Sequence, residues 1–262
     1  MHELTDTQNE RDDRNLPIDR VGIRSLKHPV AVMGRDGEFQ HTVADVSLAV
    51  NLPREKRGTH MSRFVEVLND HGNRLDVTDL SEVSRQLRER LEAEQTWVSY
   101  KFPFFLSKAA PVTGKEGKLD YEVCLEIADC ETRGEDLVLT VIVPVTTLCP
   151  CSKAISERGA HNQRGIVTFS VRSSEPLWIE EAIEIVEQSA SSELYSLLKR
   201  PDEKEVTERA YDHPVFVEDL VRNVARRSEK HGVISWYRVE AENFESIHNH
   251  SAYAQIHQIK DE

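Results

Sequence analysis

The chain has 262 residues, of which 39% are hydrophobic, so it is long enough for one large domain or two small ones. Its formal net charge is −13, which argues against a protein that binds nucleic acids or membrane surfaces, because such proteins need a basic face. No apolar run reaches the roughly 18 residues that a membrane-spanning helix requires, and the polar residues 1–20 lack the apolar segment of a secretory signal. We therefore expect a cytoplasmic protein with a disordered lead-in over residues 1–20 and four cysteines present as thiols.

The first half of the chain predicts two strands, two helices and two strands. In the second strand every other residue is apolar or small, which indicates one buried face. The second helix has apolar residues at helical spacing behind a cap at Thr78 or Asp79. Cys124 and Cys130 lie in the last strand, and we interpret them as buried side chains. The predicted strands are 21–33, 39–52, 96–106 and 119–130, and the predicted helices are 61–72 and 79–94.

The second half predicts the same order of elements, although no repeat of individual residues is present. One helix runs from about 178 into the 190s, and another begins near Pro214, a residue that suits a first helical turn. The strands are expected at 135–147, 165–174, 233–242 and 251–259. The prediction is an α+β protein of two tandem ββααββ units, 21–132 and 133–262, each with an antiparallel sheet and paired helices on one face.

The stretch LCPCSKAISERGAHNQRG places two cysteines and a histidine in a polar loop after a predicted strand. The thiolate of Cys149 and the imidazole of His161 are suitable ligands for zinc or a similar ion. A structural zinc site usually has four ligands in two compact pairs, and a redox pair usually has two residues between its thiols. Cys151 follows Cys149 after a single proline. From the spacing alone, three alternatives therefore stay open: a catalytic metal, a structural metal, and unliganded or redox thiols.

Carboxylates and histidines elsewhere add candidates. Glu203 lies in a polar connection between predicted helices, where a solvated charge is the ordinary interpretation. Glu218 begins a helix, whose dipole stabilises a carboxylate, but it would equally accept hydrogen bonds from the ring N–H groups of a ligand. Glu245, His248 and His250 fall within six residues after a predicted strand. They form either an acid–base or metal cluster or a surface turn.

A basic segment, KRGTHMSRF, surrounds the start of the first predicted helix. Lys56, Arg57, His60 and Arg63 combine positive side chains with a helix N-terminus, which suits anionic phosphates. The alternative is an ordinary charged helix start.

These segments together resemble GTP cyclohydrolase of type IB. The stretches that carry the resemblance are GTHMSRF, LCPCSKAIS, GAHNQRG, HPVFVEDLVR and ESIHNH, spread from about residue 20 onward. The resemblance implies a tunnelling fold (T-fold), whose unit is the ββααββ pattern. It also implies a cytoplasmic homotetramer with sites at subunit interfaces, and a reaction that opens the imidazole ring of GTP, releases formate and yields dihydroneopterin triphosphate on the way to folate.

The resemblance also assigns residues. It implies one divalent metal held by Cys149, His161 and Glu203, with Glu218 anchoring the purine edge. Because the chain lacks the Cys-x-x-His motif of type IA enzymes, a carboxylate replaces a sulfur ligand, and manganese or iron become plausible besides zinc. Cys151 is then expected not to bind the metal but to pack beside Cys149 or to support it. The catalytic cluster comprises Cys149, Glu245, His248 and His250, and the triphosphate contacts are drawn from Lys56, Arg57, His60, Arg63, Lys153 and Arg164.

Within this cluster we expect His248 to protonate the departing ring nitrogen, with Glu245 orienting its imidazole. Two alternatives are kept. One is the T-fold nitrile reductase of queuosine synthesis, which uses a cysteine nucleophile and a nicotinamide cofactor without metal. The other is a non-catalytic, metal-stabilised binding module, which would unfold when its metal is removed.

Overall fold

The computed structural model describes residues 6–8 and 10–259 and divides into two compact units. Unit 1 comprises residues 1–102 and 124–138, and unit 2 comprises residues 103–123 and 139–262. Three strands of about fifteen residues, β4 (Gln95–Ala109), β5 (Glu116–Cys130) and β6 (Gly134–Leu148), contribute residues to both units.

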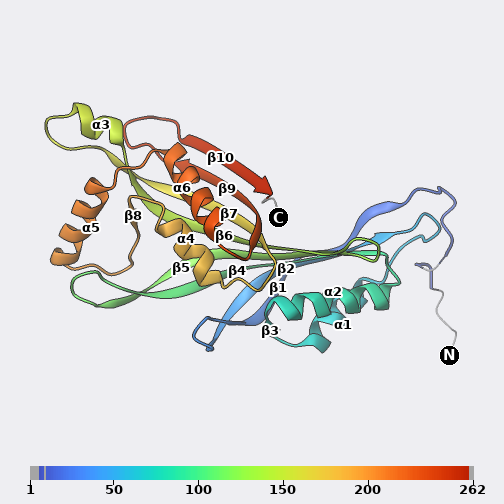
Figure 1. The fold of residues 1–262 in the computed structure, drawn as a ribbon. Coiled ribbons are helices and arrows are strands. Elements are labelled where there is room, and N and C mark those ends of the chain that lie inside the picture. The colour runs from blue at the N-terminus through green and yellow to red at the C-terminus, as the bar shows by residue number, and fades with distance from the viewer. Residues whose placement is uncertain (1–5, 9, 260–262) are drawn as a thin grey trace. The chain divides into compact units, whose positions relative to one another are not determined.

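Unit 1 is an antiparallel sheet covered by two helices. Strand β1 (Ile18–Met33) pairs with β2 (Phe39–Leu52), β2 pairs with β4, and the short β3 (Arg74–Leu75) adds to β1 in parallel. The helices are α1 (Met61–His71) and α2 (Val77–Leu91), which pack on one face of these strands (Figure 1). Its core consists of fully buried side chains of β2, α1, α2 and β4, among them Val46, Leu48, Phe64, Val67, Leu80, Leu87, Val98 and Phe102.

Helix α2 begins two residues earlier than the sequence predicted. Its N-cap is Asp76, whose side chain accepts a hydrogen bond from the backbone N–H of Asp79 at 2.8 Å. The Asp79 carboxylate in turn accepts from the Asp76 N–H at 2.8 Å, which completes a capping box. The predicted cap at Thr78 or Asp79 was therefore wrong in position, because Asp79 is the reciprocal partner of the cap.

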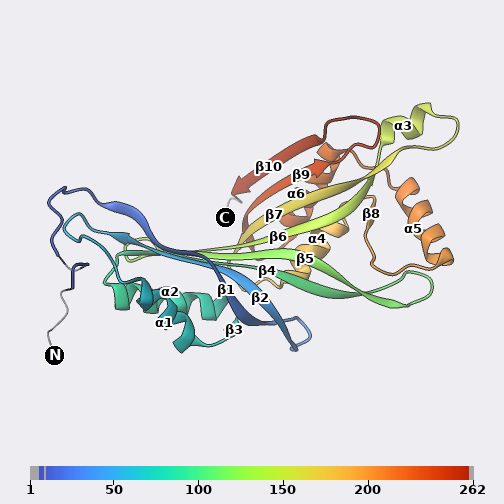
Figure 2. The ribbon, with the colours of Figure 1, turned by 180° about the vertical axis from the view of Figure 1, so that it is seen from behind.

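Unit 2 is a second antiparallel sheet with helices on one face. Strand order is β5, β6, β7 (Asn162–Ser173), β9 (Ile234–Asn243) and β10 (Ala252–Ile259), and β8 (Ser192–Glu193) pairs with β6 off this path. Helices α4 (Ile179–Glu187) and α6 (Val217–Lys230) cover one face of β6, β7 and β9 (Figures 1 and 2). The core alternates along the strands, with Val141, Val143, Val145, Val167, Phe169 and Val171 buried against Ile183, Val186, Leu220 and Val224.

The helical layer of unit 2 differs from the prediction. Helix α4 ends at Glu187, the segment expected as a polar connection forms α5 (Arg200–Asp212), and α3 (Pro150–Ile155) forms one further short helix. Pro214 precedes α6, whose N-cap is Phe216. The strand, helix, strand order of the second half was therefore confirmed in outline, with two additional helices.

Asp202 attaches the start of α5 to the turn between β4 and β5. Its fully buried carboxylate accepts hydrogen bonds from the backbone N–H groups of Val112 (2.9 Å), Thr113 (2.8 Å) and Lys199 (2.9 Å), and from the Thr113 hydroxyl (2.8 Å). Burial by itself would raise the pKa of Asp202, but these hydrogen bonds outweigh it and lower the pKa to about 2. The carboxylate therefore stays ionised, and three of its hydrogen bonds attach α5 to the β4–β5 turn while the fourth, from the N-cap Lys199, closes the start of the helix.

The polar N-terminal segment has structure in its described part. Arg11 forms an isolated bridge with Lys56, and β1 already begins at Ile18 rather than at residue 21. Residues 1–5 and 9 of the predicted lead-in lie outside the described residues. Cys124 and Cys130 lie in β5 as predicted, but both are half-buried rather than buried. No helix in the described part of the chain is long and apolar enough to cross a membrane.

Candidate active site

Strands β6 and β7 bring Cys149 and His161 opposite each other. Their antiparallel register pairs Thr147 with Gln163 and Leu148 with Asn162. One step further, the backbone N–H of Cys149 donates to the carbonyl oxygen of His161 at 3.1 Å. Two residues that the sequence proposed as metal ligands therefore lie side by side where the ladder ends.

Ser152 holds this pair together from α3. Cys149 is the N-cap of α3, and its Sγ accepts from the backbone N–H of Ser152 at 3.4 Å. The Ser152 hydroxyl donates to the carbonyl of Cys149 at 3.1 Å and accepts from the backbone N–H of His161 at 3.2 Å. The sequence reasoning missed Ser152, whose only signal was its position three residues after the cap.

The imidazole of His161 is held from its Nδ1 side. Nδ1 lies 2.9 Å from Oε1 of Gln163, and Nε2 of Gln163 donates to Oγ1 of Thr147 at 2.9 Å. Gln163 and Thr147 are both buried. Sequence reasoning missed them too, although a signal existed: each is a polar residue in the alternating buried register of its strand, with Val143 and Val145 before Thr147 and Val167 and Phe169 after Gln163.

Glu245 approaches His161 rather than His248. Its Oε2 lies 3.7 Å from Nδ1 of His161, and both side chains are about one-seventh exposed. The backbone N–H of His248 donates to the carbonyl of Glu245 at 3.3 Å, so these residues form a turn. The Glu245 carboxylate, however, lies beside the ring of His161, the candidate metal ligand, and not beside the ring of His248.

A close approach between strands fixes the start of the loop that carries Glu245. Gly165 of β7 faces Asn243 at the end of β9, and a Cβ added to Gly165 would lie 2.6 Å from Oδ1 of Asn243. The backbone N–H of Phe244 then donates to the carbonyl of Arg164 at 2.9 Å, while the Arg164 side chain is exposed. Glycine at position 165 therefore allows the loop to begin directly beside the Cys149–His161 pair.

His248 and His250 form a stacked pair in the same loop. Their ring centroids are 5.1 Å apart and the ring planes differ by 17°. Both side chains are exposed. The pair therefore presents two imidazoles to solvent.

Glu203 lies in the first turn of α5, with an exposed side chain. Lys153 of α3 contacts the other end of this helix: its Nζ donates to the carbonyl of Tyr211 and lies 4.2 Å from the centroid of the Tyr211 ring. Glu203 precedes Tyr211 by two helical turns, about 12 Å along the axis. In the part of the chain that the structure describes, no three His, Cys, Asp or Glu side chains are grouped so that they could hold a metal ion. Cys149 and His161 are therefore together, and Glu203 is not grouped with them.

Glu218 lies in the first turn of α6, where the sequence expected it. The backbone N–H of Val215 donates to the carbonyl of Leu148 at 3.0 Å, which attaches the segment before α6 to the end of β6. The Glu218 side chain is exposed. Among residues 6–8 and 10–259 it has no hydrogen-bond or ion-pair partner, so its two oxygens are available to a ligand.

The basic residues of KRGTHMSRF belong to unit 1, and each has a partner there. Lys56 pairs with Glu92 (2.8 Å), Arg57 with Glu10, and His60, the N-cap of α1, with Asp6 (3.3 Å). Arg63 donates to the carbonyl of Arg90 at 3.1 Å. Surface ion pairs of this kind contribute only about 0–1 kcal/mol to the stability of the fold. These cations could therefore leave their present partners and bind a phosphate at little cost in stability.

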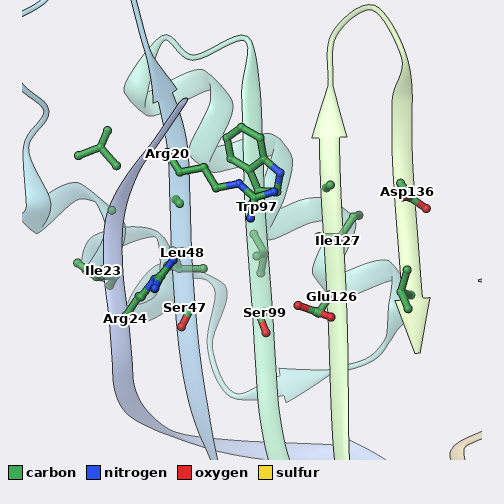
Figure 3. A pocket seen from close by; sticks show the side chains of 16 residues that line it. Arg20, Ile23, Arg24, Ser47, Leu48, Trp97, Ser99, Glu126, Ile127 and Asp136 are labelled. Carbon is green, nitrogen blue, oxygen red and sulfur yellow. The ribbon is translucent and has the colours of Figure 1, made fainter. Parts of the chain in front are cut away.

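Unit 1 also contains a hollow of about 880 Å³ on its sheet (Figure 3). Its polar lining includes Arg20, Ser47, Trp97, Ser99 and Glu126, and the guanidinium of Arg20 lies 4.4 Å from the centroid of the Trp97 ring. These positions alternate with buried ones, so the hollow opens on the face that α1 and α2 do not cover. None of the residues proposed from the sequence lines it.

Comparisons with known proteins agree with the resemblance. The family model described as type I GTP cyclohydrolase FolE2 matches residues 4–254. The chain is 60% identical over 258 residues to the GTP cyclohydrolase FolE2 of Akkermansia muciniphila, covering 98% of each chain. It is 54% identical over 257 residues to the enzyme of the same name from Methylococcus capsulatus, covering 98% of this chain and 96% of the other.

Solved structures agree on the fold. The uricase of Arthrobacter globiformis superposes with a TM-score of 0.52 over 92% of this chain and 93% of its own, at 7% identity. The urate oxidase of Bacillus sp. TB-90 gives a TM-score of 0.53 over 92% of this chain and 99% of its own, also at 7% identity. At this identity the likeness concerns the fold alone. It confirms the α+β tunnelling fold that the sequence predicted.

Proposed function

This chain belongs to the type I GTP cyclohydrolase family FolE2, and on that premise we propose that it opens the imidazole ring of GTP by hydrolysis at a centre built on Cys149 and His161. The products are formate, from C8, and 7,8-dihydroneopterin triphosphate, at the first step of folate synthesis. The observation that carries the chemistry is the 3.1 Å hydrogen bond that places Cys149 beside His161. The family match favours this function over a nitrile reductase or a non-catalytic module.

The donors support a divalent metal, which we propose to be zinc, manganese or iron. Cys149 supplies a sulfur, and the ring of His161 is held at Nδ1 by Gln163, so that Nε2 is the nitrogen left to bind an ion. Glu203 is the proposed third ligand, by its match to the family's carboxylate. When bound, a divalent ion would supply Lewis acidity that activates water for attack at C8.

Glu218 is the proposed anchor for the guanine edge. An exposed carboxylate without a partner among the described residues can accept two ring N–H groups at once, and hydrogen bonds to a charged acceptor are about twice as strong as neutral ones. The triphosphate contacts are proposed to come from Lys153 and Arg164 of unit 2, together with the basic residues Lys56, Arg57, His60 and Arg63.

The stacked imidazoles supply the proton transfers in this proposal. Their rings stack at a centroid distance of 5.1 Å, which places two imidazoles, common acid–base groups in catalysis, side by side in one loop. We assign His248 as the acid that protonates the departing ring nitrogen, with His250 as the second ring of the pair. Glu245, whose carboxylate lies 3.7 Å from His161 Nδ1, supports the proposed metal ligand.

We further propose that the enzyme is a cytoplasmic homotetramer with its sites at subunit interfaces, as the family resemblance implies. Under this proposal each site combines residues of two neighbouring subunits, so mixed tetramers of two inactive variants test it. Mixing Cys149→Ala subunits with Arg63→Ala subunits would then regenerate some active sites, whereas each variant alone would be inactive.

The activity test uses the purified chain reconstituted with Zn²⁺, Mn²⁺ or Fe²⁺ and incubated with GTP. Stoichiometric formate and a pterin that fluoresces after oxidation are the expected products. The matched control is Cys149→Ala, which retains the fold but loses the proposed sulfur ligand. Absence of both products with all three metals would overturn the proposal.

A further inference from the structure

A buried chain of three polar side chains ends at the ring of His161. Thr147 and Gln163 are cross-strand partners in the β6–β7 ladder, and Nε2 of Gln163 donates to Oγ1 of Thr147 at 2.9 Å. Oε1 of Gln163 then lies 2.9 Å from Nδ1 of His161. Thr147 is fully buried and Gln163 is 7% exposed. Two polar side chains on buried strand positions are costly unless they are paired, and here both are paired within one chain of contacts that leads to His161.

The direction of the hydrogen bonds sets the tautomer of His161. With its NH₂ group on Thr147, the Gln163 amide presents its oxygen to Nδ1, which must then carry the proton. The reverse amide orientation would point the NH₂ group at Nδ1 and leave a ring lone pair facing the Glu245 carboxylate, 3.7 Å away. A lone pair beside a carboxylate is repelled, whereas an N–H is attracted. Glu245 therefore favours the orientation in which Nδ1 is protonated.

We infer that Gln163 is a positioning residue which, held by Thr147, keeps His161 in its Nδ1–H tautomer and so leaves the Nε2 lone pair free for a divalent ion. This inference rests on the proposed function, in which His161 is a metal ligand. A neutral imidazole has one lone pair, and the partner of its other nitrogen decides which nitrogen can bind a metal. Gln163 thus prepares the ligand before the ion arrives.

The experiment measures metal affinity and tautomer separately. Zn²⁺ affinity is determined by competition with a chromogenic chelator for the wild-type chain and for Gln163→Met, which keeps the volume of the side chain. Partners of metal ligands typically contribute 10- to 100-fold in affinity, so Gln163→Met should bind Zn²⁺ at least about 10-fold more weakly. The tautomer is read in the metal-free protein from the ¹⁵N chemical shifts of labelled histidine, with His161 assigned by His161→Gln.

Thr147 provides matched controls. Thr147→Ser keeps the hydroxyl that orients the amide and should retain both the Nδ1–H tautomer and the Zn²⁺ affinity. Thr147→Val keeps the shape, loses the hydroxyl, and should shift both measurements toward those of Gln163→Met. Melting curves at equal protein concentration identify any variant that loses its fold, and the comparison of serine with valine at position 147 then decides the result.

The outcomes separate the inference from the proposed function. A wild-type His161 protonated at Nε2, or unchanged tautomer and affinity in Gln163→Met, would overturn the role of Gln163 while the metal site stands. Unchanged Zn²⁺ affinity in His161→Gln would instead overturn the metal-ligand role of His161. A tautomer shift in Gln163→Met together with weaker Zn²⁺ binding supports both.

Discussion

The backbone N–H of Cys149 donates to the carbonyl of His161 at 3.1 Å, so the last step of the β6–β7 ladder places a thiol and an imidazole opposite each other. Cys151, two residues later, lies exposed on α3. The register of two strands whose cores are buried therefore determines which of the two cysteines meets the histidine. A slip of the register by one residue would turn every buried valine of β6 to the opposite face.

Replacing Cys149 by alanine should remove most of the bound metal and abolish turnover, because the proposed site loses its only sulfur ligand. Cys151→Ala is the matched control and should retain most of both, since its side chain is exposed and away from the ladder. Elemental analysis of the two purified variants, with rates measured on the same samples, makes the comparison. Equal metal loss in both would contradict the assignment.

Removal of the metal should leave the fold largely intact. The Cys149–His161 pair is already held by the β6–β7 ladder and by the hydrogen bonds of Ser152, none of which requires an ion. Chelation should therefore abolish activity while the melting temperature falls only by the amount that ligand binding contributes. Unfolding on chelation, seen as loss of secondary structure by circular dichroism, would instead indicate a structural metal.

Replacing Asp202 by alanine should lower the free energy of unfolding by about 1.5–3 kcal/mol, because three backbone N–H groups and the Thr113 hydroxyl lose their charged acceptor. The control Thr113→Val removes one of the four hydrogen bonds and should cost about 1 kcal/mol. Urea unfolding at fixed protein concentration measures both variants. Similar small losses in the two would show that Asp202 does not anchor α5.

The long strands and the amphipathic helices were predictable because burial imposes a period of two or of 3.6 on the sequence. Helix α5 was not, since it is polar along most of its length and only Asp202 and Ala210 are buried. What stabilises its start is a set of hydrogen bonds to the β4–β5 turn, about 90 residues earlier in the chain. Local periodicity carries no information about such a partner.

The residues of the candidate site were proposed from the sequence, but the contacts between them could not be predicted from it. The sequence placed Glu245 with His248 because they are three residues apart, whereas the structure places its carboxylate beside His161. That contact depends on Gly165 and Asn243, which bring the end of β9 against β7. Side-chain contacts between residues on different strands depend on the strand register and on how closely the backbones approach. Neither can be predicted from the spacing of residues along the chain.

Glu218→Gln should weaken GTP binding and leave the metal content near that of the wild type. The amide keeps the shape but loses the charged acceptor, and hydrogen bonds to charged groups contribute about 1.5–3 kcal/mol. That range corresponds to about 10- to 150-fold in affinity. Isothermal titration with GTP in the absence of turnover, using the metal-free protein, measures the effect.

Asp219→Asn is the matched control for Glu218→Gln. It removes the same charge from the first turn of α6, but its carboxylate faces the backbone N–H of Phe216 at 3.3 Å as part of the cap. Both changes should lower helix stability by similar small amounts, of about 0.3–1 kcal/mol. Only Glu218→Gln should affect GTP affinity, and equal effects of the two variants would exclude Glu218 as the anchor.

His248→Ala should bind both metal and GTP yet lose on the order of 10²–10⁴-fold in rate, which is the usual contribution of one acid–base group. The stacked ring of His250, at 5.1 Å, is chemically equivalent and also exposed, so His250→Ala is its matched control. A larger loss in His248→Ala than in His250→Ala supports the assignment of His248 as the acid. Metal content, GTP affinity and rate are measured on the same preparations, because loss of metal together with rate would make His248 a ligand instead. Near wild-type turnover in His248→Ala with a large loss in His250→Ala would transfer the acid role to His250, whose ring is the nearest alternative donor in the loop.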